Sequence, residues 1–270
     1  MDILKPEILH KLSPQRKEEI LKRSMVDVSS VYLETREIVM DIQRRGDAVS
    51  IEHYRKYKED ISEYDFLVTE AEIAQAYEAI DQNIIEKLKF AALNIEKFHQ
   101  FQLDPKMWSV EIMDGITAGR LVRPMDIVGA YVPGRKAIYP SSVLMTIIPA
   151  KVAGVGKIIA CTPPDEGMVA NKATIVAADI AGADQIFKIG GPWAIASMAY
   201  GTAIIPKVDK IVGPGNKYVT AAKMLTFGQV NIDSPAGPSE VLILADETAR
   251  ARLTAIDMLS QVEHDEDAAA

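Results

Sequence analysis

From residue 127 onward, short apolar runs typical of buried β-strands alternate with segments of helical character. The runs begin about thirty residues apart, which is the length of a βαβ unit. Runs of valine and isoleucine that alternate with helices predict an α/β fold, with a parallel sheet covered on both faces. The expected strands are 127–132, 157–161, 185–189, 210–212 and 240–245, and the expected helices are 141–153, 168–181, 193–200 and 216–227.

The first four expected strands each end in a turn rich in glycine or proline, at 132–135, 162–164, 190–192 and 213–215. In open α/β sheets, ligands bind beyond the carboxyl ends of the strands. These turns should therefore line one rim of the sheet, and that rim is the first candidate binding site.

Two of these turns carry groups suited to a dinucleotide. The turn 213–216, Gly-Pro-Gly-Asn, opens a helix, where glycines let backbone N–H groups approach an anion. A plain tight turn with Asn216 as the helix N-cap is the alternative. At the end of its own strand, Tyr131 precedes the cations Arg135 and Lys136, which could meet phosphate or form a solvated basic loop.

Other candidate side chains have an equally plain alternative. Trp193 could stack on a ring or serve in packing, and Cys161 is more typical of a buried packing residue than of a nucleophile. Between Pro235 and Pro238 the chain is stiff, and the Ser239 hydroxyl that follows could bind a substrate or belong to a connection between domains.

Near residue 270, Gln261 and His264 stand three residues apart and therefore share one face of an expected helix. A neutral histidine with an oxygen ligand suits Zn²⁺. One histidine and one amide do not complete a four-ligand site, so a polar helix end is the alternative.

Composition excludes several classes of function. The formal net charge is −8, which argues against a nucleic-acid surface. No apolar run is long enough to cross a membrane, and the first twenty residues lack the apolar core of a signal peptide. A single cysteine allows no intrachain disulfide. We expect a cytoplasmic protein whose ligands are small molecules.

Residues 6–103 have mostly helical character. Thr69 and Glu72 form a capping-box pattern, and 81–101 predicts a long helix. The runs 108–113 and 116–122, joined at an Asp-Gly pair, predict a β-hairpin.

Specific strings run through nearly the whole chain in one order. They are RRGDAV (44–49), NIEKFH (94–99), VGAYVPG (128–134), SSVLMTIIPAKVAGV (141–155), CTPP (161–164), IGGPWAIASMAYGT (189–202), IPKVDKIVGPGNKYVTAAK (205–223), IDSPAGPSEVLILAD (232–246) and SQVEHDEDAAA (260–270). By these strings the chain resembles the histidinol dehydrogenases. The resemblance implies a homodimer that uses NAD and zinc to oxidise L-histidinol to L-histidine through the aldehyde.

The resemblance also assigns residues. It implies that Tyr131, Trp193 and Asn216 lie at positions that contact NAD, that Ser239 contacts the substrate, and that Gln261 and His264 bind both zinc and substrate. Trp193 departs from the family, which usually has glutamine there. The family's catalytic Glu-His pair and two further zinc ligands are expected beyond Ala270, so we expect no catalytic base among these residues.

The implied domains are a helical arm (1–24), an incomplete α/β domain (25–130 with 240–270) and a Rossmann-like domain on the NAD side (131–239). Two alternatives to a histidinol dehydrogenase stay open. One is a related dehydrogenase that acts on another alcohol, suggested by Trp193. The other is a non-catalytic, truncated chain that binds nucleotide.

Overall fold

The computed structural model describes residues 8–22, 28–134, 139–235, 240–263 and 268–270. The chain forms two compact units, one of residues 28–235 and one of residues 1–27 with 236–270. The expected boundary at residue 131 falls at the end of β3 (Ile127–Tyr131), inside the sheet of the larger unit. The three-part division into domains stays a prediction.

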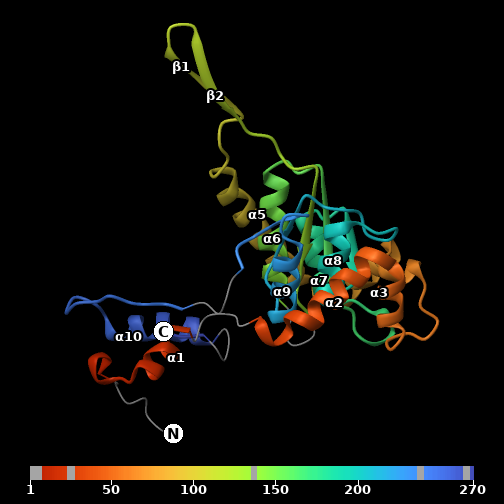
Figure 1. Cartoon of the computed structure of the whole chain (residues 1–270), viewed down its shortest axis with the longest axis horizontal. Helices are drawn as coiled ribbons and strands as arrows, with labels where there is room; N and C mark the ends of the chain where they lie inside the picture. The colour runs from red at the N-terminus through yellow and green to blue at the C-terminus, as the bar shows by residue number, and fades with distance from the viewer. Residues whose placement is uncertain (1–7, 23–27, 135–138, 236–239, 264–267) are drawn as a thin grey trace. The chain divides into compact units, whose positions relative to one another are not determined.

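A five-stranded parallel sheet forms the centre of the larger unit (Figure 1). The strand order is β5-β4-β3-β6-β7, so the chain starts in the middle, runs outward on one side and then returns to the other. The remaining strands are β4 (Lys157–Thr162), β5 (Gln185–Lys188), β6 (Lys210–Val212) and β7 (Asn231–Ile232). The expected strands from 127 to 212 are confirmed, and β7 is an addition.

Helices cover both faces of this sheet, as the pattern predicts. One face carries α6 and α7 with α4 and α5 outside them, and the other carries α8 and α9 with α2 and α3. Their bounds are α2 (Ser29–Arg45), α3 (Asp47–Tyr54), α4 (Glu70–Ala79), α5 (Gln82–Gln100), α6 (Pro140–Val152), α7 (Lys172–Ala181), α8 (Gly191–Tyr200) and α9 (Lys217–Thr226). Short 3-10 helices lie at η2 (Glu63–Phe66) and η3 (Glu166–Met168).

The start of one helix differs from its prediction by four residues. Helix α7 begins at Lys172 rather than at residue 168, because the Asn171 side chain accepts hydrogen bonds from the backbone of Ala173 and Thr174. Met168 instead ends η3 with a φ of 62°. An asparagine cap satisfies N–H groups that the first helical turn cannot, and this fixes where the helix begins.

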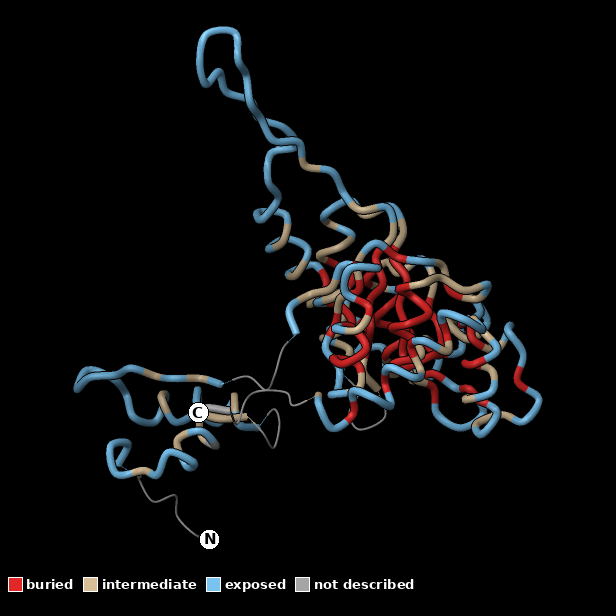
Figure 2. Tube along the Cα trace, viewed as in Figure 1, coloured by how far each residue is buried: buried red, intermediate tan, exposed pale blue. Residues whose placement is uncertain are grey.

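Alternation along β4 divides the core into two layers. Ile158 and Ala160 lie in the apolar cluster with α6 and α7, whereas Ile159 and Cys161 lie in the cluster with α8 and α9. All four side chains are buried, since successive residues of a strand point to opposite faces. Burying a side chain such as Ile159 contributes about 1.5–3 kcal/mol. Figure 2 shows this buried core around the sheet.

The predicted hairpin is confirmed as β1 (Met107–Met113) and β2 (Ile116–Leu121), paired in antiparallel register. Every residue of both strands is exposed, and the hairpin projects from the larger unit (Figure 2). The predicted long helix is confirmed as α5. Along this helix Ile85 and Ala92 are buried, whereas Ile84 and Phe98 are exposed.

In the smaller unit, the structure describes η1 (Leu9–Lys11), α1 (Pro14–Lys22) and α10 (Ala251–Val262). The strand expected at 240–245 is wrong. Among the described residues, pairing is limited to an isolated bridge between Glu240 and Ala269, in which the Val241 N–H donates to the Ala269 carbonyl oxygen. Leu242 and Leu244 are almost fully exposed. A strand needs a neighbour for its backbone groups, and no other described residue pairs with this segment. No helix in the described ranges is long and apolar enough to cross a membrane.

Candidate functional site

The sheet order reverses direction between β3 and β6. From β3 the chain passes to β4 and β5 on one side, while β6 and β7 lie on the other. Such a reversal opens a crevice beyond the carboxyl ends of the two central strands, where α/β sheets bind ligands. Tyr131 ends β3 and Gly213 directly follows β6, so two of the predicted turns meet at this position.

Position 213 requires a glycine for two reasons. Its φ is +116°, a conformation that L-residues rarely adopt. A Cβ placed on it would also overlap the backbone carbonyl oxygen of Tyr131 on the neighbouring strand. The glycine therefore lets the two central strands keep their separation where the crevice begins.

A partly buried ion pair holds the Gly213 peptide in place. Lys223 of α9 donates from Nζ to the Gly213 carbonyl oxygen and to Asp233 Oδ1, both at 2.5 Å. Asp233 Oδ2 accepts a hydrogen bond from the Gly213 N–H at 2.7 Å. Sequence reasoning missed both charged residues. The only signal was a lysine within an otherwise apolar stretch of a predicted helix.

Asn216 is confirmed as the N-cap of α9. Its side-chain oxygen accepts hydrogen bonds from the backbone of Tyr218 and Val219 at 3.1 and 3.2 Å. Gly215 lies against Val219, and a Cβ on Gly215 would overlap that side chain. Gly215 is exposed, and none of the described residues accepts a hydrogen bond from its N–H. The start of α9 therefore presents a donor to solvent, as anion-binding turns do.

Tyr131 is buried, with 4% of its surface exposed. Its hydroxyl accepts a hydrogen bond from the Gly191 N–H at 3.1 Å. Burial raises the pKa of Tyr131 to about 12, with Cys161 adding to the rise and the Gly191 hydrogen bond opposing it. The tyrosine joins β3 to the turn after β5, and its ring packs in the core.

The turn before α8 is held from a second side by Tyr54 of α3, whose hydroxyl accepts from the Gly190 N–H at 2.7 Å. A Cβ on Gly190 would overlap Pro163, which follows β4. A Cβ on Gly134, after β3, would also meet Pro163, at 3.2 Å. The predicted rim is therefore confirmed, since the turns after β3, β4 and β5 approach one another closely.

Trp193 stands in the first turn of α8 and stacks on His53 of α3. The ring centroids are 3.5 Å apart and the planes are inclined by 27°. The indole is partly buried and contacts the same apolar cluster as α8. Trp193 therefore serves in packing, which was one of its two predicted roles, and its stack on His53 joins α3 to the rim.

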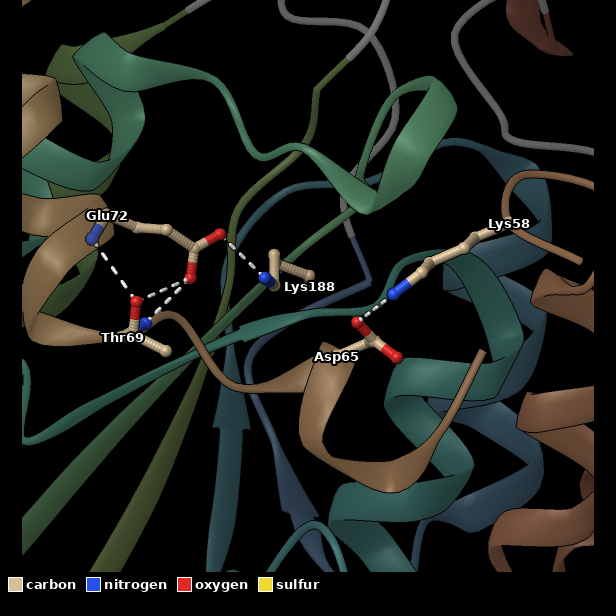
Figure 3. A network of polar contacts seen from close by, with 5 residues as sticks. All are labelled: Lys58, Asp65, Thr69, Glu72 and Lys188. Carbon is tan, nitrogen blue, oxygen red and sulfur yellow. Dashed lines mark hydrogen bonds and ion pairs between the residues drawn. The ribbon is translucent and has the colours of Figure 1, made fainter. Parts of the chain in front are cut away.

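A second polar network joins α4 to the sheet (Figure 3). Lys188, at the end of β5, donates to Glu72 at 2.7 Å, and Glu72 completes the predicted capping box with Thr69. Burial tends to raise the pKa of Glu72, but the hydrogen bonds from Lys188 and Thr69 lower it overall.

Lys58 and Asp65 form the neighbouring pair in Figure 3, with 2.7 Å between Nζ and Oδ1. Burial alone would raise the pKa of Asp65, yet hydrogen bonds from Lys58 and Ser62 outweigh it and bring that pKa to about 2. Both networks join segments of the larger unit, and neither includes a residue of the turn 213–216 after β6.

The predicted zinc and substrate residues lie elsewhere in the chain. Ser239 and His264 fall outside the described residues. Gln261 lies near the end of α10, in the smaller unit, and is partly buried. Within the described ranges, no three histidine, cysteine, aspartate or glutamate side chains gather as a metal site would require. The described residues alone do not fit a zinc ion, so we derive no chemistry through one.

Cys161 behaves as the packing residue that its sequence suggested. It is fully buried in the layer with α8 and α9, and burial raises the pKa of its thiol far above the usual range. A thiol that stays protonated is a poor nucleophile.

The strand order of the sheet defines a class of protein: a doubly wound α/β domain with a topological switch point, which is where such domains bind ligands. The histidinol dehydrogenase family model matches residues 21–270. A histidinol dehydrogenase of Methanothermobacter thermautotrophicus is 47% identical over 255 residues, which cover 94% of this chain and 59% of that protein. The chain belongs to the histidinol dehydrogenase family.

Other relatives agree. The histidinol dehydrogenase of Methanococcus maripaludis is 46% identical over 261 residues, covering 96% of this chain and 61% of that protein. The crystal structure of histidinol dehydrogenase from Elizabethkingia anophelis has a TM-score of 0.83 and 39% identity, covering 95% of this chain and 59% of that one. The chain thus spans about 60% of the length of these relatives.

Proposed function

We propose that the chain is the nucleotide-binding part of a histidinol dehydrogenase, an enzyme of histidine biosynthesis that oxidises L-histidinol to L-histidine. The overall reaction passes through the aldehyde and transfers two hydrides to NAD⁺. Membership of the family supports the substrate and the reaction. The whole enzyme acts as a cytoplasmic homodimer in this proposal.

The observation that carries the cofactor proposal is the turn 213–216 at the switch point between β3 and β6. Two glycines there are needed because a Cβ would overlap the Tyr131 carbonyl oxygen at Gly213 and the Val219 side chain at Gly215, and Gly215 is exposed at the start of a helix. NAD supplies a hydride acceptor when bound. Asn216 and Gly215 would hold its pyrophosphate at the helix start, and Trp193 lies on the same rim, where it would contact a ring.

The role proposed for Tyr131 is indirect in the present geometry. Its hydroxyl is engaged with Gly191 and its ring is buried, so it supports the rim on which the cofactor lies. Direct contact with the cofactor would require its side chain or the Gly191 turn to move.

In the whole enzyme, we propose that Gln261 and His264 bind zinc. The same two residues and Ser239 would contact the substrate. The 270 residues contain four histidines, and His10, His53 and His99 are distant in sequence from His264. The resemblance to the family implies that two further zinc ligands and the catalytic base would come from residues that these 270 do not include. We expect the 270-residue chain to bind NAD⁺ without oxidising histidinol.

Calorimetric titration of the purified 270-residue chain with NAD⁺ tests the cofactor, and NADH formation with L-histidinol tests turnover. Binding without turnover is the expected result. Turnover by this chain would disprove the missing base, and absence of NAD⁺ binding would disprove the cofactor site in this chain. Zinc content after dialysis, measured by mass spectrometry, is expected to be far below one ion per chain.

A further inference from the structure

Lys223 is unusual because its charged side chain is buried. Its side chain is 6% exposed, while that of its partner Asp233 is 34% exposed. Lysine is almost never fully buried unless it is paired. A buried ion pair loses hydration on both groups, and well-packed apolar residues often give equal or greater stability. The pair therefore needs an explanation other than stability.

The geometry of the pair supplies one. Three hydrogen bonds form a closed ring, in which Lys223 and Asp233 hold each other and together hold both the C=O and the N–H of Gly213. The backbone N–H of Asp233 also donates to the Ile211 carbonyl oxygen, which ties the ring to β6. Fixing both polar groups of one residue fixes the orientation of the peptide planes on either side of it.

The other end of the same turn is fixed independently. Asn216 accepts two backbone hydrogen bonds at the start of α9, and Pro214 has a restricted φ. Between these points, the Gly215 N–H has no acceptor among the described residues. A turn held at both ends loses little conformational entropy when it binds an anion, so its affinity rises.

We propose that Lys223 and Asp233 are positioning residues, which hold the turn 213–216 in the conformation that receives the pyrophosphate of NAD. This inference rests on the proposed cofactor. Neither residue touches the cofactor in this assignment, because both act through the Gly213 peptide.

The chain contains a matched control pair in Lys188 and Glu72. The Lys188 side chain is 7% exposed and that of Glu72 is 31% exposed, with 2.7 Å between the charged atoms. This pair joins α4 to β5 and has no hydrogen bond to the turn 213–216. Substitution of Lys188 therefore removes a comparable buried ion pair without loosening the turn.

The experiment compares Lys223→Met, Asp233→Asn and Lys188→Met with the unaltered 270-residue chain. Calorimetry gives the Kd for NAD⁺, thermal unfolding gives Tm, and NMR-detected hydrogen exchange follows the amides of Gly213 and Gly215. We expect Lys223→Met to raise the Kd about tenfold and to speed amide exchange in the turn. Asp233→Asn keeps one acceptor oxygen and should have a smaller effect, whereas Lys188→Met should change the Kd less than about twofold.

A double variant, Lys223→Met with Asp233→Leu, separates positioning from stability. We expect its Tm to return toward that of the unaltered chain, because no lone charge is left buried, while the Kd stays about tenfold raised. It also replaces Lys223→Met if the single variant does not fold. An unchanged Kd and unchanged exchange in the double variant would overturn the proposal.

The cofactor site and the positioning role of Lys223 and Asp233 are tested by different measurements. If the unaltered chain does not bind NAD⁺, the proposed cofactor site fails, and the exchange experiment alone decides on positioning. Faster exchange at Gly213 and Gly215 in Lys223→Met, but not in Lys188→Met, supports the positioning role. Equal exchange in both variants disproves it.

Discussion

Alanine substitutions at three glycines of the larger unit distinguish the cost of backbone strain from the cost of steric overlap. Gly213→Ala incurs both costs, and each of the other two substitutions incurs one. Gly228 has a φ of +96° and open space around the position of a Cβ. Gly190 has an ordinary φ of −135°, but a Cβ there would overlap Pro163. Gly213 has a φ of +116° and would overlap the Tyr131 carbonyl oxygen.

The expected losses of stability follow from these environments. Gly228→Ala imposes a left-handed conformation on alanine, which costs about 1–2 kcal/mol. Gly190→Ala overfills a packed contact, at about 1–3 kcal/mol. Gly213→Ala has both terms, since its Cβ meets backbone on a central strand that cannot yield alone, so we expect about 2–5 kcal/mol.

Urea unfolding followed by circular dichroism measures these differences, and thermal unfolding checks them. For a unit of this size, 1 kcal/mol shifts Tm by about 2–4 °C. Gly213→Ala should lose more stability than either Gly228→Ala or Gly190→Ala. If Gly213→Ala loses no more stability than Gly228→Ala, overlap with Tyr131 is not what requires glycine at the switch point.

Further predictions concern groups outside the turn. The pKa of Asp65 is depressed to about 2 from its ordinary value of 3.8, so about 2 kcal/mol of stability present above pH 5 should be lost as the pH falls to 2. Urea titrations should show a loss over this pH range that is about 2 kcal/mol larger in the unaltered chain than in Asp65→Asn. Thr69→Ala removes a helix cap and should cost about 1 kcal/mol, whereas Thr69→Ser should retain most of the stability. The raised pKa of Cys161 should keep its thiol unreactive to iodoacetamide at pH 8 until the chain unfolds, as mass spectrometry would show.

The hydrophobic pattern by itself determined most of the sheet. Valine and isoleucine runs such as the one around Ile159 cannot face water on either side, so a parallel sheet between helices follows from the residues alone. Local chemistry also fixed the helix caps at Thr69 and Asn216, because a cap depends on a side chain and the backbone two or three residues away. The specific strings fixed the family.

Contacts between distant segments were decided only by the tertiary structure. Nothing local in the sequence shows that Lys223 and Asp233 meet at Gly213, or that Lys188 reaches Glu72 across more than one hundred residues of sequence. Segment 240–245 has the composition of a strand yet is not one here, since a strand also requires a partner. Side-chain composition sets which surfaces must be buried, whereas the order in which strands meet decides which charges face each other and where a crevice opens.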